Sequence, residues 1–176
     1  MINASDILNA KVLVVDDQES NVLLLEQMLR EAGYACVTST MDPRAVVGLH
    51  REHHYDLILL DLQMPGMDGF QVMEGLKTIE PEGYLPVLVI TAQPAHKLQA
   101  LQAGAKDFVS KPFDVLEVKT RIHNMLEVRL LYKRLEQTVE KRTAELRESE
   151  ARFSAVREMT GFLAQARHRR TPVKGA

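Results

Sequence analysis

The stretch Leu57-Ile58-Leu59-Leu60-Asp61 is a run of four apolar residues that ends in a carboxylate. A strand that is apolar at every position is typical of a parallel sheet covered on both faces. Four more short runs, rich in β-branched residues, lie in the first two thirds of the chain. They are residues 12–15, 36–38, 87–90 and 108–109. The pattern predicts five strands of a buried parallel sheet.

Helical stretches alternate with these strands. They span about residues 20–31, 43–53, 69–79 and 95–102. Gly33, Gly83 and Gly104 follow three of them as expected helix stops. A fifth helix is expected to begin near Asp114, a good N-cap residue. This alternation predicts an α/β fold with a doubly wound, five-stranded parallel sheet.

Composition narrows the class of protein. Of 176 residues, 45% are hydrophobic and 26% are charged, the mix of a globular protein without long disorder. The only cysteine, Cys36, excludes an intramolecular disulfide, and we expect it to be a buried apolar side chain. No apolar run reaches the ~18 residues of a transmembrane helix, and the start, with Asp6, does not resemble a signal peptide. We therefore predict a cytoplasmic protein.

The charge is divided between the two ends. Residues 1–125 hold 10 Lys+Arg and 17 Asp+Glu, a net of -7, whereas residues 126–176 hold 12 and 7, a net of +5. The two values sum to the formal net charge of -2. An acidic front and a basic rear predict two functional parts.

Polar side chains stand at the ends of four of the predicted strands. Asp16 and Asp17 end the first, Asp61 the third and Thr91 the fourth, and Lys111 follows the fifth. In an open parallel sheet the active site lies beyond these carboxyl ends. Three converging carboxylates suit Mg²⁺, while a hydroxyl and an ammonium suit an anionic tetrahedral group. The set predicts phosphoryl transfer, although any one of these residues alone is usually a turn or loop residue.

Four motifs surround these side chains. They are Val14-Val15-Asp16-Asp17, Leu60-Asp61-Leu62-Gln63-Met64-Pro65-Gly66-Met67-Asp68-Gly69, Ile90-Thr91-Ala92 and Lys111-Pro112-Phe113. With them, residues 11–124 resemble the receiver domain of bacterial two-component response regulators. The resemblance covers about two thirds of the chain and implies a flavodoxin-like receiver fold that is phosphorylated by a histidine kinase. No motif is missing, so we expect a working receiver.

The resemblance also implies roles for single residues. Asp61 would be the phosphoacceptor. Asp17 and Asp61 would hold Mg²⁺ directly, together with the Gln63 carbonyl, and Asp16 would act through a metal-bound water. Lys111 would pair with Asp61 at rest and with the phosphoryl group afterwards.

The resemblance further implies a switch pair. The Thr91 hydroxyl would move toward the phosphate while the Phe108 ring turns inward. Ala92 would leave room for the phosphoryl group, and the Lys111-Pro112 bond is expected to be cis.

Gln63 and Gln93 follow Asp61 and Thr91 by two residues and should flank the mouth of the site. Two amides there can either orient or obstruct the water that hydrolyses the acyl phosphate, so the lifetime of the phosphorylated state stays open.

Other titratable residues are weaker candidates for a metal site or a phosphorylation site. His50, His53 and His54 have spacings that could bind a metal, but their charged neighbours favour solvated side chains. His123 lacks the surroundings of a kinase phosphohistidine, since Asn124 follows it.

The sequence of the last third of the chain predicts one long helix. Residues 114–160 contain no Gly or Pro, and strong helix formers dominate. A heptad seam can be written through it with alternating spacings of three and four. Its positions are Met125, Val128, Tyr132, Leu135, Val139, Arg142, Leu146, Ser149, Phe153, Val156, Thr160 and Leu163. Nine of these twelve are apolar or aromatic, which predicts a coiled coil.

The flanking charges do not settle the form of the coil. In a parallel dimer Glu145 would face Glu150 of the second copy, and Arg152 would face Arg157, and such like-charge pairs weaken pairing. The coil can therefore be marginal, bent, antiparallel or adjustable. The alternative is a single amphipathic helix folded back on the front domain. DNA binding is disfavoured, because no break separates two helices and the basic residues alternate with glutamates.

We predict a receiver domain over residues 1–124, a signalling helix over 125–164 and a disordered basic tail over 165–176. The predicted protein is no enzyme in the usual sense. It would accept a phosphoryl group on Asp61 with Mg²⁺ as cofactor, and would signal as a homodimer through the long helix, without membrane contact. The alternatives are an adaptor whose helix docks on a partner protein, a phosphate sink, and the N-terminal fragment of a larger signalling protein. The complete-looking start and end favour a natural short protein.

Overall fold

The computed structural model describes residues 2–80 and 83–168, apart from the side chains of 94 and 168. It divides into two compact units, Met1–Lys133 and Arg134–Ala176. The first unit therefore includes residues 125–133, which the sequence assigns to the signalling helix. Residues 165–168 of the predicted tail are still helical, and residues 169–176 lie outside the described part.

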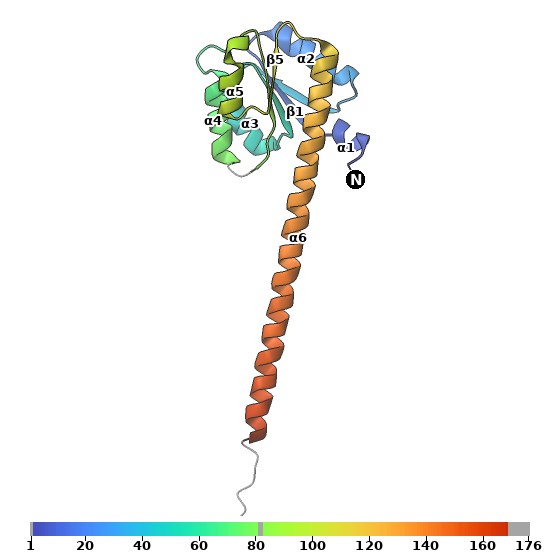
Figure 1. Cartoon of the computed structure of the whole chain (residues 1–176), viewed down its shortest axis with the longest axis vertical. Helices are drawn as coiled ribbons and strands as arrows, with labels where there is room; N and C mark the ends of the chain where they lie inside the picture. The colour runs from blue at the N-terminus through green and yellow to red at the C-terminus, as the bar shows by residue number, and fades with distance from the viewer. Residues whose placement is uncertain (1, 81–82, 169–176) are drawn as a thin grey trace, which may run out of the picture. The chain divides into compact units, whose positions relative to one another are not determined.

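The first unit is built around a parallel sheet of five strands in the order β2-β1-β3-β4-β5 (Figure 1). The strands are β1 (Lys11–Val15), β2 (Cys36–Thr40), β3 (Leu57–Leu60), β4 (Val87–Thr91) and β5 (Asp107–Ser110). β1, β3 and β4 are the inner strands, and β3 and β4 are buried at every position. The predicted doubly wound sheet is confirmed.

Helices join the strands. They are α1 (Ala4–Leu8), α2 (Glu19–Glu31), α3 (Val46–His53), α4 (Gly69–Ile79), α5 (Lys97–Ala103) and α6 (Val115–His168), with 3-10 turns η1 (Pro43–Ala45) and η2 (Pro94–His96). Asp114 caps α6 as predicted, since its side chain accepts a hydrogen bond from the Glu117 N–H. Gly33 and Gly104 have positive φ at the ends of α2 and α5, whereas α4 ends before Gly83. The short helix α1 was not predicted.

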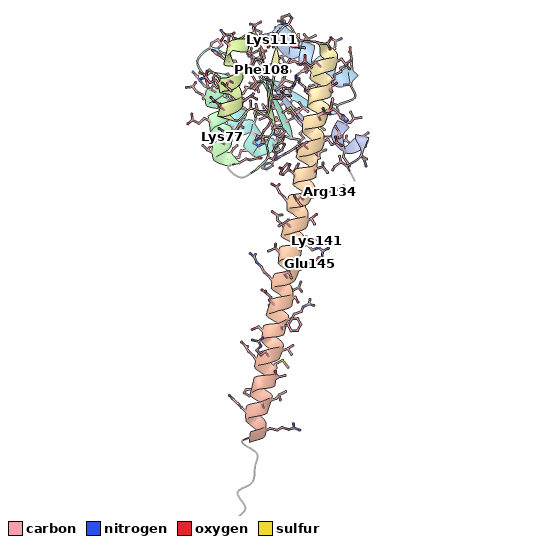
Figure 2. All side chains as sticks on the ribbon, viewed as in Figure 1. Lys77, Phe108, Lys111, Arg134, Lys141 and Glu145 are labelled. Atoms are coloured by element: carbon pink, nitrogen blue, oxygen red, sulfur yellow. The ribbon has the colours of Figure 1, made fainter. Side chains whose placement is uncertain are left out.

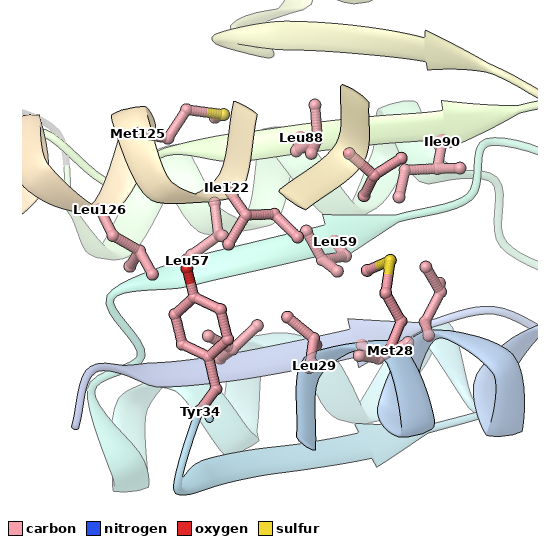
Figure 3. Close-up of a cluster of buried hydrophobic side chains, with 14 of the residues drawn as sticks. Met28, Leu29, Tyr34, Leu57, Leu59, Leu88, Ile90, Ile122, Met125 and Leu126 are labelled. Carbon is pink, nitrogen blue, oxygen red and sulfur yellow. The ribbon is translucent and has the colours of Figure 1, made fainter. Parts of the chain in front are cut away.

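Alternating strand residues fill two cores. Val12 and Val14 face the side covered by α2 and α6, and Leu13 and Val15 face the side covered by α3, α4 and α5. Figure 3 shows the first core, in which Leu57 and Leu59 of β3 lie between Leu29 of α2 and Ile122 of α6. Ile122, Met125 and Leu126 are buried, so the start of α6 is part of the domain core. Met125 therefore packs inside the domain and is not free for a coiled-coil seam.

Two sequence expectations are wrong. Cys36 is exposed, because β2 is an edge strand whose residues are only partly covered. His50 is 1% exposed, although its charged neighbours favoured a solvated side chain. It is buried because Glu80, 30 residues away, accepts a hydrogen bond from it.

The second unit is the remaining part of α6. Every side chain from 134 to 167 is exposed within this single chain. Among the described residues, no helix combines the length and apolar character needed to cross a membrane.

Candidate functional site: an acidic cluster at the sheet edge

Three carboxylates converge at the carboxyl ends of β1 and β3. Asp16, Asp17 and Asp61 each offer an oxygen atom, and these atoms all lie within 4.8 Å of one another. Asp16 and Asp61 are buried, and Asp17 is partly buried. The parallel register brings them together, because Val15 pairs with Leu60, and Asp16 and Asp61 directly follow these two residues.

Lys111 lies among these carboxylates. Its Nζ atom is 2.6 Å from Asp16 Oδ2 and 2.9 Å from Asp61 Oδ2. Burial lowers the Lys111 pKa, but the hydrogen bonds and negative charges of Asp16 and Asp61 outweigh burial and raise it above its usual value. The predicted contact with Asp61 is present, and the contact with Asp16 was not predicted. The Lys111-Pro112 peptide bond is cis, as expected.

Further donors hold Asp16 and Asp61 in place. Asp16 Oδ1 accepts hydrogen bonds from the Gln18 N–H at 2.9 Å and from Asn21 Nδ2 at 3.1 Å. Asp61 Oδ1 accepts one from the Gln63 N–H at 3.2 Å. Asn21 was not predicted from the sequence, and its position in the first turn of α2 was the only signal for it.

The donor set fits a divalent cation. Three carboxylates and one ammonium leave two negative charges uncompensated. Asp17 Oδ1 is buried and has no hydrogen-bond partner among the described residues. A buried oxygen of this kind costs free energy unless a donor or a cation satisfies it. Hard oxygen ligands in this number suit Mg²⁺.

The predicted switch residues lie on β4 and β5, the two strands that follow β3 in the sheet. Thr91, at the end of β4, is fully buried, and its Oγ1 has no hydrogen-bond partner within the described part of the chain. The Phe108 ring is also buried, in the core on the α4 side. Figure 2 labels Phe108 and Lys111 near the same end of the first unit. An unpaired hydroxyl beside an acidic cluster is able to donate to an incoming oxyanion.

A shallow pocket opens beside the cluster. Asp17, Gln63 and Gln93 line it, together with Phe70 and His96. The two glutamines therefore flank the mouth of the site, as the sequence predicts. His96 packs edge-on against Phe70, with ring centroids 6.0 Å apart, and neither residue was predicted from the sequence.

A second polar cluster surrounds His50. The Tyr55 N–H donates to His50 Nδ1 at 3.2 Å, so Nε2 carries the hydrogen and donates to Glu80 Oε1 at 2.8 Å. Chiefly because of this hydrogen bond, and helped by the charge of Arg129, the pKa of Glu80 is lowered despite its partial burial. Asp56 is also buried, and it accepts from Lys133 Nζ at 2.7 Å. These contacts hold the start of α6 on the domain.

His53 and His54 are exposed, and no grouping of His50 with them as metal ligands is found in the described residues.

A doubly wound parallel sheet with an acidic cluster and a lysine at its carboxyl edge defines a flavodoxin-like receiver. The family described as response regulator receiver domain matches residues 12–123, and the chain belongs to that family. Receiver domains accept phosphoryl groups from histidine kinases and bind Mg²⁺ in this acidic cleft.

Two curated relatives illustrate the similarity. The chain is 39% identical to the response regulator PleD of Caulobacter vibrioides over 132 residues, which cover 74% of the chain and 29% of PleD. It is 36% identical to the alkaline phosphatase synthesis transcriptional regulatory protein PhoP of Bacillus subtilis over 121 residues, which cover 68% of the chain and 49% of PhoP. The chain thus spans less than half the length of these relatives.

Solved structures agree in fold. The chemotaxis protein CheY4 of Vibrio cholerae has a TM-score of 0.59 at 29% identity, covering 65% of this chain and 98% of that one. The receiver domain of a sensor histidine kinase of Pseudomonas aeruginosa has a TM-score of 0.62 at 29% identity, covering 68% and 98%. In that structure a magnesium ion is coordinated in the active-site cleft.

Proposed function

We propose that this receiver accepts a phosphoryl group on Asp61 and passes the signal on through a dimer of α6. The observation that supports the phosphoacceptor role is the position of Asp61, which is within 4.8 Å of Asp16 and Asp17 and 2.9 Å from Lys111 Nζ. The donor would be a phosphohistidine of a kinase in the cytoplasm.

The transfer is one displacement at phosphorus. An Asp61 carboxylate oxygen attacks, the phosphorus–oxygen bond forms and the phosphorus–nitrogen bond of the donor histidine breaks. The histidine nitrogen keeps the electron pair, and the product is an acyl phosphate. Little covalent chemistry is left to the protein, so positioning and charge carry the catalysis.

Asp17, Asp61 and the Gln63 carbonyl would hold Mg²⁺ directly, with Asp16 behind a water. Bound there, Mg²⁺ would supply charge that offsets the oxygens of the transferring group. The Lys111 ammonium, now on Asp16 and Asp61, would turn to a phosphoryl oxygen.

The response would begin at Thr91. Its buried hydroxyl lacks a partner within the described residues and would donate to the phosphoryl group. The Phe108 ring would then be held in its buried position, and the altered surface would carry the signal to α6. Because the apolar side chains of residues 134–167 are exposed in one chain, a second copy is the occupant we propose for them.

Labelling with acetyl phosphate tests the phosphoacceptor. We expect Mg²⁺-dependent labelling that hydroxylamine removes, as it removes acyl phosphates, and its loss in Asp61→Asn. The matched control is Asp6→Asn, a partly exposed aspartate on α1. If Asp61→Asn were labelled like the unchanged protein, the assignment would be wrong.

A further inference from the structure

The second unit exposes a long apolar face. Eight large apolar side chains in it are between 56% and 74% exposed. They are Leu135, Val139, Leu146, Phe153, Val156, Met159, Phe162 and Leu163. A helix face of this length requires cover from another helix. Figure 2 labels Glu145, which flanks the face.

A parallel pair fits this face poorly. In a parallel, in-register dimer each seam residue meets its own copy, so Arg142 would lie against Arg142 and Ser149 against Ser149. Two guanidinium groups buried against each other repel and lose their hydration.

An antiparallel pair removes these like-with-like layers. The seam alternates between two positions of the heptad, called a and d. In an antiparallel coiled coil, an a residue of one helix packs against a d residue of the other helix. One alignment places Val139 opposite Val156. Every polar seam residue then meets an apolar one: Arg142 meets Phe153, Ser149 meets Leu146 and Thr160 meets Leu135. The Arg142 guanidinium would lie over an aromatic ring, which is a favourable cation–π contact.

The flanking charges favour the same arrangement. In the parallel form Glu145 faces Glu150, and Arg152 faces Arg157. In the antiparallel alignment Glu145 faces Arg152, and Glu136 faces Arg157, each twice by symmetry. Four repulsive contacts are thus exchanged for four attractive ones.

The charges also select the register. A shift of one heptad in one direction places Glu145 opposite Glu145, and a shift in the other places Arg152 opposite Arg152. In the single chain Arg152 bonds to Glu148 at 2.5 Å, but both side chains are exposed, so exchanging this partner costs little.

We infer that residues 135–163 of two copies pair antiparallel, with Val139 opposite Val156. This inference rests on the dimer that forms part of the proposed function and assigns its orientation. Charge complementarity identifies a second copy of this chain as the occupant of the exposed face.

Disulfide cross-linking in the full-length chain tests the orientation. Cys36, which is exposed, is first replaced in a Cys36→Ser background. A chain with Val139→Cys is then mixed with a chain of different mass that carries Val156→Cys, and the mixture is oxidised. We expect the mixed disulfide. The single Val139→Cys chain is the matched control and should not link to itself, because the two sites would lie about 25 Å apart along the axis.

A charge exchange gives an independent readout. Glu145→Arg should weaken the antiparallel dimer about tenfold, and adding Arg152→Glu should restore it. In a parallel dimer Glu145→Arg would instead strengthen pairing, since the new arginine would face Glu150. The sedimentation of each variant is measured over a range of concentrations by analytical ultracentrifugation.

Self-linking of Val139→Cys, or a tighter Glu145→Arg dimer, would overturn the antiparallel arrangement. A chain that stays monomeric at all concentrations would overturn it together with the dimer of the proposed function. Neither result affects the labelling of Asp61, which tests the phosphoacceptor separately.

Discussion

Lys111 Nζ lies 2.9 Å from Asp61 Oδ2, although 50 residues separate the two in the chain. The lysine bridges to Asp16 as well, so one ammonium holds two of the three clustered carboxylates. Its positive charge stabilises the clustered carboxylates and would oppose a cation bound among them.

The first prediction concerns this balance. Lys111→Met should tighten Mg²⁺ binding at least about tenfold, because a positive charge next to the cluster is removed. It should also reduce labelling of Asp61, since the phosphoryl group loses a charge partner. Titration with Mg²⁺ by calorimetry checks the affinity, and Lys97→Met, an exposed lysine on α5, is the control. An unchanged affinity would contradict this account of the electrostatics.

The second prediction concerns Mg²⁺ and Asp17. Because a ligand that binds only the folded state raises its stability, Mg²⁺ should raise the Tm and a chelator should reverse the effect. Asp17→Asn should abolish most of this shift, since Asp17 Oδ1, a buried oxygen with no hydrogen-bond partner in residues 2–80 and 83–168, is lost as a ligand. A Tm shift that persists in Asp17→Asn would place the cation elsewhere.

The third prediction concerns the turn after β3. A Cβ atom on Gly69 would lie 2.6 Å from the Asp61 carbonyl oxygen and 2.9 Å from Leu62 Cα. Gly69→Ala should therefore cost about 1–3 kcal/mol of unfolding free energy and lower the labelling of Asp61. Gly48→Ala is the control, because a Cβ there has no described atom within 4 Å. It should stabilise α3 slightly, by about 0.5–1 kcal/mol. Denaturant unfolding of both variants measures the difference.

The fourth prediction concerns Glu80 and pH. Its pKa is lowered in the folded state, mainly by the hydrogen bond from His50, so its ionised form stabilises the fold. This contribution is present above the unfolded pKa and is lost as the pH falls through the lower, folded pKa. Glu80→Gln should therefore cost about 1–2 kcal/mol at pH 7, and the cost should shrink at acidic pH, where Glu80 is itself protonated.

Unfolding curves from pH 7 down to about 3 check this, with Glu74→Gln on the exposed face of α4 as the control. A cost for Glu80→Gln that does not change with pH would show that shape, and not charge, matters at this position.

Much of the candidate site could be predicted from the sequence because its parts follow strand ends. A carboxylate after each of two continuous apolar strands must reach the same edge once the strands are parallel and in register. Asp16, Asp17, Asp61, Thr91 and Lys111 all follow this rule, and the structure brings the carboxylates and the lysine together there.

Local patterns failed where a distant partner or the strand order decided the outcome. His50 is buried because Glu80 accepts a hydrogen bond from it, and that contact depends on how α3 and α4 pack. Cys36 is exposed because β2 lies at the edge of the sheet. The sequence of a short apolar run does not indicate whether its strand will lie at the edge or in the middle of the sheet.

By itself, then, the sequence determined the alternation of strands and helices and the identity of the clustered carboxylates, because both depend on local periodicity. Only the tertiary structure decided where α6 stops being part of the domain. Met125, Leu126 and Arg129 are buried against the sheet and its loops, while from residue 134 onward the same helix is exposed. One continuous heptad pattern covers both parts, and packing against a folded surface is what separates them.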